Sequence, residues 1–463
     1  MKKKFNHYLI RQFVDAFNDN KECFYTEEEL GIILHYFYFI EPDKFKMRFA
    51  LKIALKQYKK DVRFIIYAAR YYTMIENYEK ALKFLMLIDI YPQSDCEEEV
   101  YVLRGDCYTK SKLHKMAIYW YKRAAHVSST KENYARQIGD NYCALNNFDD
   151  ALKYYMMYFS QYADDESIIY DLNFCWANLG TYKVAIDFLQ RYIKTNNPFS
   201  AIAWFVIGLD YVAMDNFIEA TESFKFSLAI NPESAATYFN LGNAYFQISE
   251  YAKAIDAYQN SMKYEDNKQY VTLNYIGECY MMMEEYDDAV SFFNRSLEIN
   301  DNYDEGYCSM AKAFNKQEKN IEALVCIDKA ISINGKEPDF FSVKGNVLFD
   351  LDRFDETEVC LLKALELNPE DIDLRIGVVG FYLFMNEPDK GINFLIEYVN
   401  NSDVEDIVLC LYSICNFYAG NKQEAYKYLS KALAANPDVI SWINDNENYS
   451  DFTADPGINE LLH

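Results

Sequence analysis

The residues best suited to chemistry in this sequence are eleven cysteines and five histidines, and their spacing does not favour a reactive site. No two cysteines form a Cys-x-x-Cys pair, and no metal-ligand spacing links the histidines, which are His7, His35, His114, His126 and His463. The sequence also lacks a P-loop, a Gly-x-Gly-x-x-Gly, a nucleophile elbow and a His-Glu-x-x-His. We therefore expect no cofactor, no metal and no enzymatic activity.

Four of the cysteines recur at one place in a repeated pattern. Each stands two residues after a small or polar residue, in the pairs Gly105 and Cys107, Asn173 and Cys175, Gly277 and Cys279, and Ser413 and Cys415. A cysteine that recurs in this way is typical of a small core side chain in a reducing compartment. We expect these four to fill the core rather than to act as redox or metal sites.

The four cysteines belong to a repeat that is clearest elsewhere in the chain. In the stretch 201–266 the pattern of apolar and small residues recurs every 34 positions. The first copy contains Trp204, Ile207, Gly208, Tyr211, Ala220, Phe224 and Ser227. The residues 34 positions later are Tyr238, Leu241, Gly242, Tyr245, Ala254, Tyr258 and Ser261. Only Pro232, at the end of the first copy, is not repeated.

The second copy shows how one unit folds. Between Ala235 and Gln247 the apolar and small residues follow a 3-4-3 spacing, which predicts one apolar face of a helix. A second such face begins at Ala254. The short turn at 249–251 permits only an antiparallel hairpin. Because one hairpin cannot bury both of its faces, each unit must stack on its neighbours.

A unit of this length and order resembles the tetratricopeptide repeat (TPR) family. The frame continues from Val62 to Val439 at spacings of 34 to 36 residues, which makes about eleven units. The resemblance implies an all-α fold, a right-handed α-solenoid (superhelix) of tandem antiparallel helix pairs. We expect N-terminal capping helices with a degenerate repeat at 1–61, the repeats at 62–439, and a C-terminal cap and tail at 440–463. Thr26 and Glu29 predict a capping box in the first of these regions.

The charge narrows the choice of partner. The chain carries 46 basic and 71 acidic residues, a formal net charge of −25, which disfavours nucleic acid and anionic membranes. No apolar run approaches the roughly 18 residues needed to span a bilayer. The basic N-terminus, Met1 to Lys4, is not followed by the apolar segment of a signal peptide. We therefore expect a soluble, cytoplasmic protein that does not bind membranes.

The resemblance also implies that the first helices line a concave side, which commonly holds a peptide. In each unit the second, fifth, ninth, twelfth and thirteenth residues are expected to project away from the second helix. In the fourth to seventh units most of these places are apolar, as at Tyr170, Phe174, Phe205, Leu209, Phe239, Phe246 and Met281. A second apolar set near the end of the chain includes Ile376, Leu383, Phe384 and Ile414. An exposed apolar patch of this extent normally marks a binding surface. The alternative is that curvature of the array buries these side chains as core.

Two asparagines, Asn240 and Asn243, complete the candidate groove. They match part of the clamp by which some TPR domains hold a C-terminal carboxylate, but Phe205 and Phe239 occupy places where that clamp requires lysine. We therefore do not expect a carboxylate clamp, and the two asparagines either bind a peptide backbone or are simply solvated. The predicted function is a non-enzymatic interaction scaffold for a peptide or protein segment. The alternative is a structural or assembly protein whose apolar face mediates self-association into a homo-oligomer.

Overall fold

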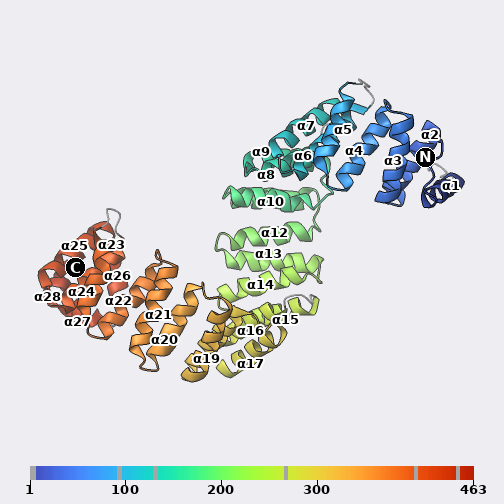
Figure 1. Ribbon diagram of the computed structural model, residues 1–463. Helices are drawn as coiled ribbons and strands as arrows, with labels where there is room; N and C mark the ends of the chain where they lie inside the picture. Colours follow the sequence, from blue (N-terminus) through green and yellow to red (C-terminus); the bar gives the residue numbers. More distant parts are fainter. Residues whose placement is uncertain are drawn as a thin grey trace. The chain divides into compact units, whose positions relative to one another are not determined.

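The structure is a computed structural model that describes residues 7–90, 96–128, 134–264, 269–400, 405–444 and 449–462. Within these ranges every regular element is a helix, no strand occurs, and the helices pack in consecutive pairs (Figure 1). The chain is therefore all-α, an α-solenoid of tandem antiparallel helix pairs. It divides into two compact units, Met1–Pro232 and Glu233–His463, which are described separately below.

Unit 1 contains the first thirteen helices of the described residues. They are α1 (His7–Asn18), α2 (Glu27–His35), α3 (Lys44–Gln57), α4 (Val62–Met74), α5 (Tyr78–Ile88), α6 (Glu97–Lys110), α7 (His114–Val127), α8 (Ala135–Cys143), α9 (Phe148–Gln161), α10 (Ile168–Asn178), α11 (Tyr182–Thr195), α12 (Ala201–Val212) and α13 (Phe217–Ile230). A π-helical turn, η1 (Tyr36–Ile40), extends α2.

Unit 2 contains the remaining helices of the described residues. They are α14 (Ala235–Gln247), α15 (Tyr251–Tyr264), α16 (Gln269–Met282), α17 (Tyr286–Ile299), α18 (Asp304–Lys316), α19 (Asn320–Ile333), α20 (Pro338–Phe349), α21 (Phe354–Leu367), α22 (Ile372–Phe384), α23 (Pro388–Val399), α24 (Asp406–Tyr418), α25 (Lys422–Ala435), α26 (Val439–Asn444), α27 (Ser450–Ala454) and α28 (Pro456–Leu462).

In five of the helix pairs, an aromatic ring of the second helix lies directly against a glycine of the first helix. A Cβ atom added to any of these glycines would come within 2.4–2.6 Å of the ring. The pairs are Gly105 and Tyr121, Gly139 and Tyr155, Gly208 and Phe224, Gly242 and Tyr258, and Gly277 and Phe293. The alanines at the small place of the second helix, such as Ala220 and Ala254, are fully buried. The repeated glycine and alanine therefore mark the close approach of two backbones.

The turn inside each pair contains one residue with positive φ, and these residues recur 34 to 36 positions apart. They are Glu76, Lys112, Asn146, Gly180, Asp215, Ser249, Glu284, Glu318, Asp352, Asn386 and Gly420. At Ser249 the next amide, that of Glu250, donates to the Tyr245 carbonyl at 2.9 Å. This hydrogen bond is typical of a Schellman motif, which ends a helix and redirects the chain.

The two ends of the chain have their own local structure. The predicted capping box is confirmed, since the Glu29 amide donates to Thr26 Oγ1 at 3.3 Å and the Thr26 amide donates to Glu29 Oε2 at 2.8 Å. At the other end, α27 packs against α24, and α28 packs against α25. The predicted N-terminal segment Met1 to Lys4 and the last residue, His463, lie outside the described residues. No helix in the described ranges is long and apolar enough to cross a membrane.

Candidate functional site

The four recurring cysteines are fully buried, as predicted for core side chains. Cys143, on α8, differs because it is only half-buried and its Sγ lies 3.5 Å from the Sγ of Cys175. The Tyr155 hydroxyl lies 3.6 Å from Cys143 Sγ, but its single proton is donated to Asp140 Oδ1 at 2.9 Å. A hydrogen bond from the Cys175 thiol lowers the pKa of the Cys143 thiol below its ordinary value. The sequence did not single out this cysteine.

The four predicted groove residues of unit 1 lie on two neighbouring first helices, α10 and α12. Tyr170 and Phe174, on α10, are 46% and 55% exposed, and Phe205 and Leu209, on α12, are half-buried. The Phe205 ring contacts that of Phe224, with ring centroids 5.9 Å apart. We call Tyr170, Phe174, Phe205 and Leu209 the unit-1 apolar surface.

A polar pair lies between the same two helices, in which Asp210 is buried and Asn173 is half-buried. With its amide nitrogen rather than its oxygen placed toward α12, the Asn173 side chain of α10 donates to the two carboxyl oxygens of Asp210, at 3.0 and 3.1 Å. Asp210 is 1% exposed, and this burial raises the pKa of its carboxyl group to about 7, although the bond from Asn173 opposes the shift. Asn173 takes the place that glycine has in other units. Its hydrogen bonds to Asp210 explain why this unit has an asparagine there instead of glycine. Sequence reasoning missed Asp210, although an aspartate in the otherwise apolar helix α12 was a signal.

The five predicted groove residues of unit 2 lie on α14 and α16. Phe239 is half-buried and packs against two tyrosine rings, with centroids 5.6 Å from Tyr258 and 5.4 Å from Tyr275. Phe246 contacts the Tyr251 ring edge-on at 5.5 Å, and Met281 is half-buried. None of the nine predicted residues is fully buried. Their assignment to a peptide groove stays a prediction.

The two asparagines of α14 already have partners within their own unit. Asn240 Nδ2 donates to the Ala236 carbonyl at 2.8 Å, and Asn243 Oδ1 accepts from the Tyr258 hydroxyl at 2.7 Å. Two other pairs repeat the second bond, Tyr121 to Asp106 at 2.6 Å and Tyr155 to Asp140 at 2.9 Å. The expectation that the ninth residue of each unit projects away from the second helix is therefore wrong in these units. The side chain of the ninth residue instead points toward the second helix, where it accepts a hydrogen bond from a tyrosine hydroxyl.

Comparisons with known proteins agree with the repeat. Residues 205–267 and 339–371 each match a family model described as tetratricopeptide repeat. No curated protein matches the sequence at a significant level.

Several solved structures are similar in fold. The APC/C hetero-tetramer Cut9-Hcn1 matches at 13% identity with a TM-score of 0.41, over 92% of this chain and 99% of that chain. YrrB, titled a TPR protein with an unusual peptide-binding site, matches at 18% identity with a TM-score of 0.32, over 40% and 95%. A tetratricopeptide repeat protein from Parabacteroides merdae matches at 18% identity with a TM-score of 0.41, over 57% and 97%. Likenesses at these TM-scores carry no argument about function.

Proposed function

We propose, from the premise that the chain is a tetratricopeptide-repeat protein, that it is a non-enzymatic cytoplasmic scaffold that binds a peptide or protein segment. One observation carries the proposal: Tyr170 and Phe174 are both largely exposed on α10, beside the half-buried Phe205 on α12. Exposed aromatic side chains that adjoin further apolar residues are typical of binding surfaces. An extended segment or a helix laid across the first helices would cover them.

The charge of the chain supports a protein partner. A net charge of −25 repels nucleic acid and anionic lipid, whereas an apolar segment of a protein has no such barrier. The cysteines that recur in the repeats are buried as core, and the asparagines of α14 bond within their own unit. These side chains are therefore accounted for by the fold, and the exposed aromatic residues are left for recognition.

The test compares matched glutamate variants of the full chain. Peptides selected on the wild-type protein from a random display library are measured by fluorescence anisotropy against Phe174→Glu and Tyr170→Glu. We expect binding to weaken about tenfold or more, since a charge placed in an apolar contact loses at least about 1.4 kcal/mol. Phe199→Glu is the control, because Phe199 is 78% exposed between α11 and α12 and lies outside the predicted groove. Equal losses in all three variants, or no loss in either test variant, would contradict the proposal.

Self-association is the second candidate function, and a different surface favours it. Val325 and Val359 hold equivalent places, 34 residues apart, on α19 and α21, and both are 66% exposed. Ile321, one turn before Val325, is 65% exposed. These apolar side chains lie on second helices, so a second copy of the chain could cover them without occupying the unit-1 apolar surface. The mass of the protein in solution distinguishes the two candidates.

A further inference from the structure

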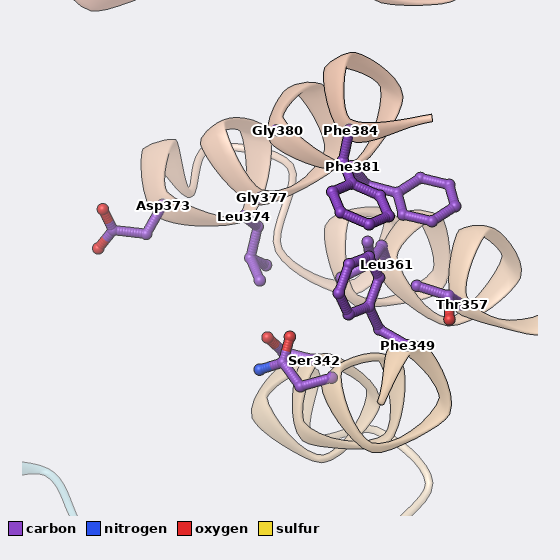
Figure 2. A pocket seen from close by; sticks show the side chains of 11 residues that line it. Ser342, Phe349, Thr357, Leu361, Asp373, Leu374, Gly377, Gly380, Phe381 and Phe384 are labelled. Carbon is purple, nitrogen blue, oxygen red and sulfur yellow. The ribbon is translucent and has the colours of Figure 1, made fainter. Parts of the chain in front are cut away.

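A cavity of about 380 Å³ lies among α20, α21 and α22 of unit 2 (Figure 2). Its size is within the range typical of ligand sites. α20 and α22 are the first helices of successive pairs, and the cavity lies between them, next to the contact of Phe349 with Phe384. Its residues are distinct from the nine groove residues that carry the proposed function, so the argument below does not depend on that proposal.

Two glycines of α22, Gly377 and Gly380, line the cavity. A Cβ atom added to either would meet no atom within 4 Å. Packing therefore does not require these glycines, unlike Gly242 and its equivalents, and glycine weakens the interior of a helix. In the next first helix, α24, the residues 34 positions later are Leu411 and Ile414, and both are fully buried. At these two places α22 therefore leaves open backbone, whereas α24 carries two buried apolar side chains.

The two ends of the cavity differ in chemistry. Figure 2 shows Asp373 at one end and Phe381 and Phe384 at the other, with Gly377 and Gly380 between them. At the aromatic end Phe384 is 63% exposed, and its ring centroid lies 4.7 Å from that of Phe349.

Besides Thr357, the polar residues that line the cavity are Ser342, Asn346 and Asp373, and Figure 2 shows Asp373 at the end away from the phenylalanines. Within the described part of the chain none of these three side chains makes a hydrogen bond or an ion pair, so each is available to a ligand. Asp373 is the one charged side chain among the residues that line the cavity. An occupant that matches this lining is cationic at one end and apolar along the rest of its length.

We propose that this cavity binds an extended, basic peptide segment in which a lysine or arginine stands two residues from an apolar side chain. The aliphatic stem of the basic residue lies along the bare backbone at Gly377 and Gly380, and its charged group pairs with Asp373. In an extended segment residues i and i+2 point to the same side, so the apolar side chain reaches Phe349 and Phe384. Long basic side chains commonly bury their stems and leave the charge at a polar edge. The net charge of −25 attracts such a segment.

The test uses the full chain and a display library of random ten-residue peptides. Selection on the wild-type protein is compared with selection on Gly377→Leu plus Gly380→Ile, which supplies the side chains that α24 has at these places. We expect the library to yield peptides with a basic residue two positions from an apolar one. The filled variant should bind those peptides about tenfold more weakly or worse, measured by fluorescence anisotropy. Gly31→Leu is the control, because a Cβ at Gly31 of α2 also meets nothing within 4 Å.

A second variant tests the charge without filling the cavity. Asp373→Asn should weaken binding of the same peptides about threefold, because Asp373 is exposed and an exposed ion pair contributes modestly. It should also reduce the dependence of binding on salt, and because the side chain is exposed the fold should remain intact, as circular dichroism would show. Peptides without a basic residue, or basic peptides that bind the filled variant and Asp373→Asn as tightly as the wild type, would overturn the proposal. Basic peptides that lose affinity in Phe174→Glu and not in these variants would do the same.

Discussion

Asp210 is a carboxyl group that is almost fully buried between α10 and α12, and its protonation makes the stability of the fold depend on pH. Burial raises its pKa from an ordinary value of 3.8 to about 7. A raised pKa means that the folded state binds the proton more tightly than the unfolded state does. The resulting stability is fully present below about pH 4 and is lost as pH rises through 7. We expect Asp210 to lower the free energy of unfolding by no more than about 4 kcal/mol across that window.

The variant Asp210→Asn removes this proton while retaining an acceptor for the Asn173 amide. Thermal melts of the wild type and the variant should therefore converge near pH 4 to 5, and the variant should be the more stable protein at pH 8. Asp215→Asn, at the exposed turn after α12, serves as the control and should leave the melting temperature unchanged at both pH 4 and pH 8. A stability difference between wild type and Asp210→Asn that does not vary with pH would contradict the burial of the charge.

Cys143 is the second residue for which the structure predicts a measurable chemical property. A hydrogen bond from the Cys175 thiol, with the two sulfur atoms 3.5 Å apart, lowers the pKa of the Cys143 thiol, and Cys143 is half-buried rather than enclosed. Because the thiolate is the nucleophile, iodoacetamide should modify Cys143 first in the folded protein at pH 7. Peptide mass spectrometry after brief labelling identifies the site. Cys175→Ala removes the donor and should slow the reaction, and preferential labelling of the buried Cys279 would contradict the prediction.

At the scale of helices, α22 and α14 contain glycines with opposite structural roles. A Cβ at Gly377 or Gly380 meets open space, so Gly377→Ala plus Gly380→Ala should stabilise α22 by about 1–2 kcal/mol through helix propensity alone. A Cβ at Gly242 would lie 2.6 Å from the ring of Tyr258, which is fully buried. Gly242→Ala should therefore destabilise the chain by about 1–3 kcal/mol. Urea unfolding measures both changes. If the two variants changed the free energy of unfolding in the same direction, this contrast would be contradicted.

The helix pairs could be predicted from the sequence where their residue pattern reflects contacts within a single repeat. The close approach of Gly242 and Tyr258 repeats every 34 residues because each hairpin solves the same packing problem. The capping box of Thr26 and Glu29 is more local still, since both hydrogen bonds join residues three apart. The Schellman turns were not predicted, because nine of the eleven turn residues with positive φ are not glycine, and five of those nine are glutamate, lysine or serine, which do not favour this conformation.

The parts of the site that escaped prediction depend on contacts between repeats or on a choice between partners. Asn173 and Asp210 are 37 positions apart on different hairpins, and neither has a local pattern that reveals the other. Asn243 was predicted to face a groove, but the hydroxyl of Tyr258 competes for its side-chain oxygen. The cavity on α22 becomes visible only when Gly377 and Gly380 are compared with their buried counterparts in α24.

At the scale of the whole molecule, the net charge of −25 decides how the two candidate functions respond to salt. Two copies of the chain repel each other most strongly at low ionic strength, where the Debye length is about 30 Å at 0.01 M. Apolar contacts between Val325 and Val359 of two copies would have to overcome this repulsion. Self-association would therefore strengthen as salt shortens the Debye length to about 8 Å at 0.15 M.

We expect the protein to remain a monomer at both ionic strengths, because its apolar surfaces are proposed to bind segments of other proteins. Light scattering coupled to size-exclusion chromatography should give a mass near 54.4 kDa at 0.01 M and at 0.15 M salt. A mass that doubles with salt and with protein concentration would favour self-association instead. Val325→Glu plus Val359→Glu would then restore the monomer if α19 and α21 form the contact, whereas Phe174→Glu would restore it if the unit-1 apolar surface does. If either variant restored the monomer, the proposed peptide scaffold would be replaced by an assembly role, and the variant would identify the helices that form the contact.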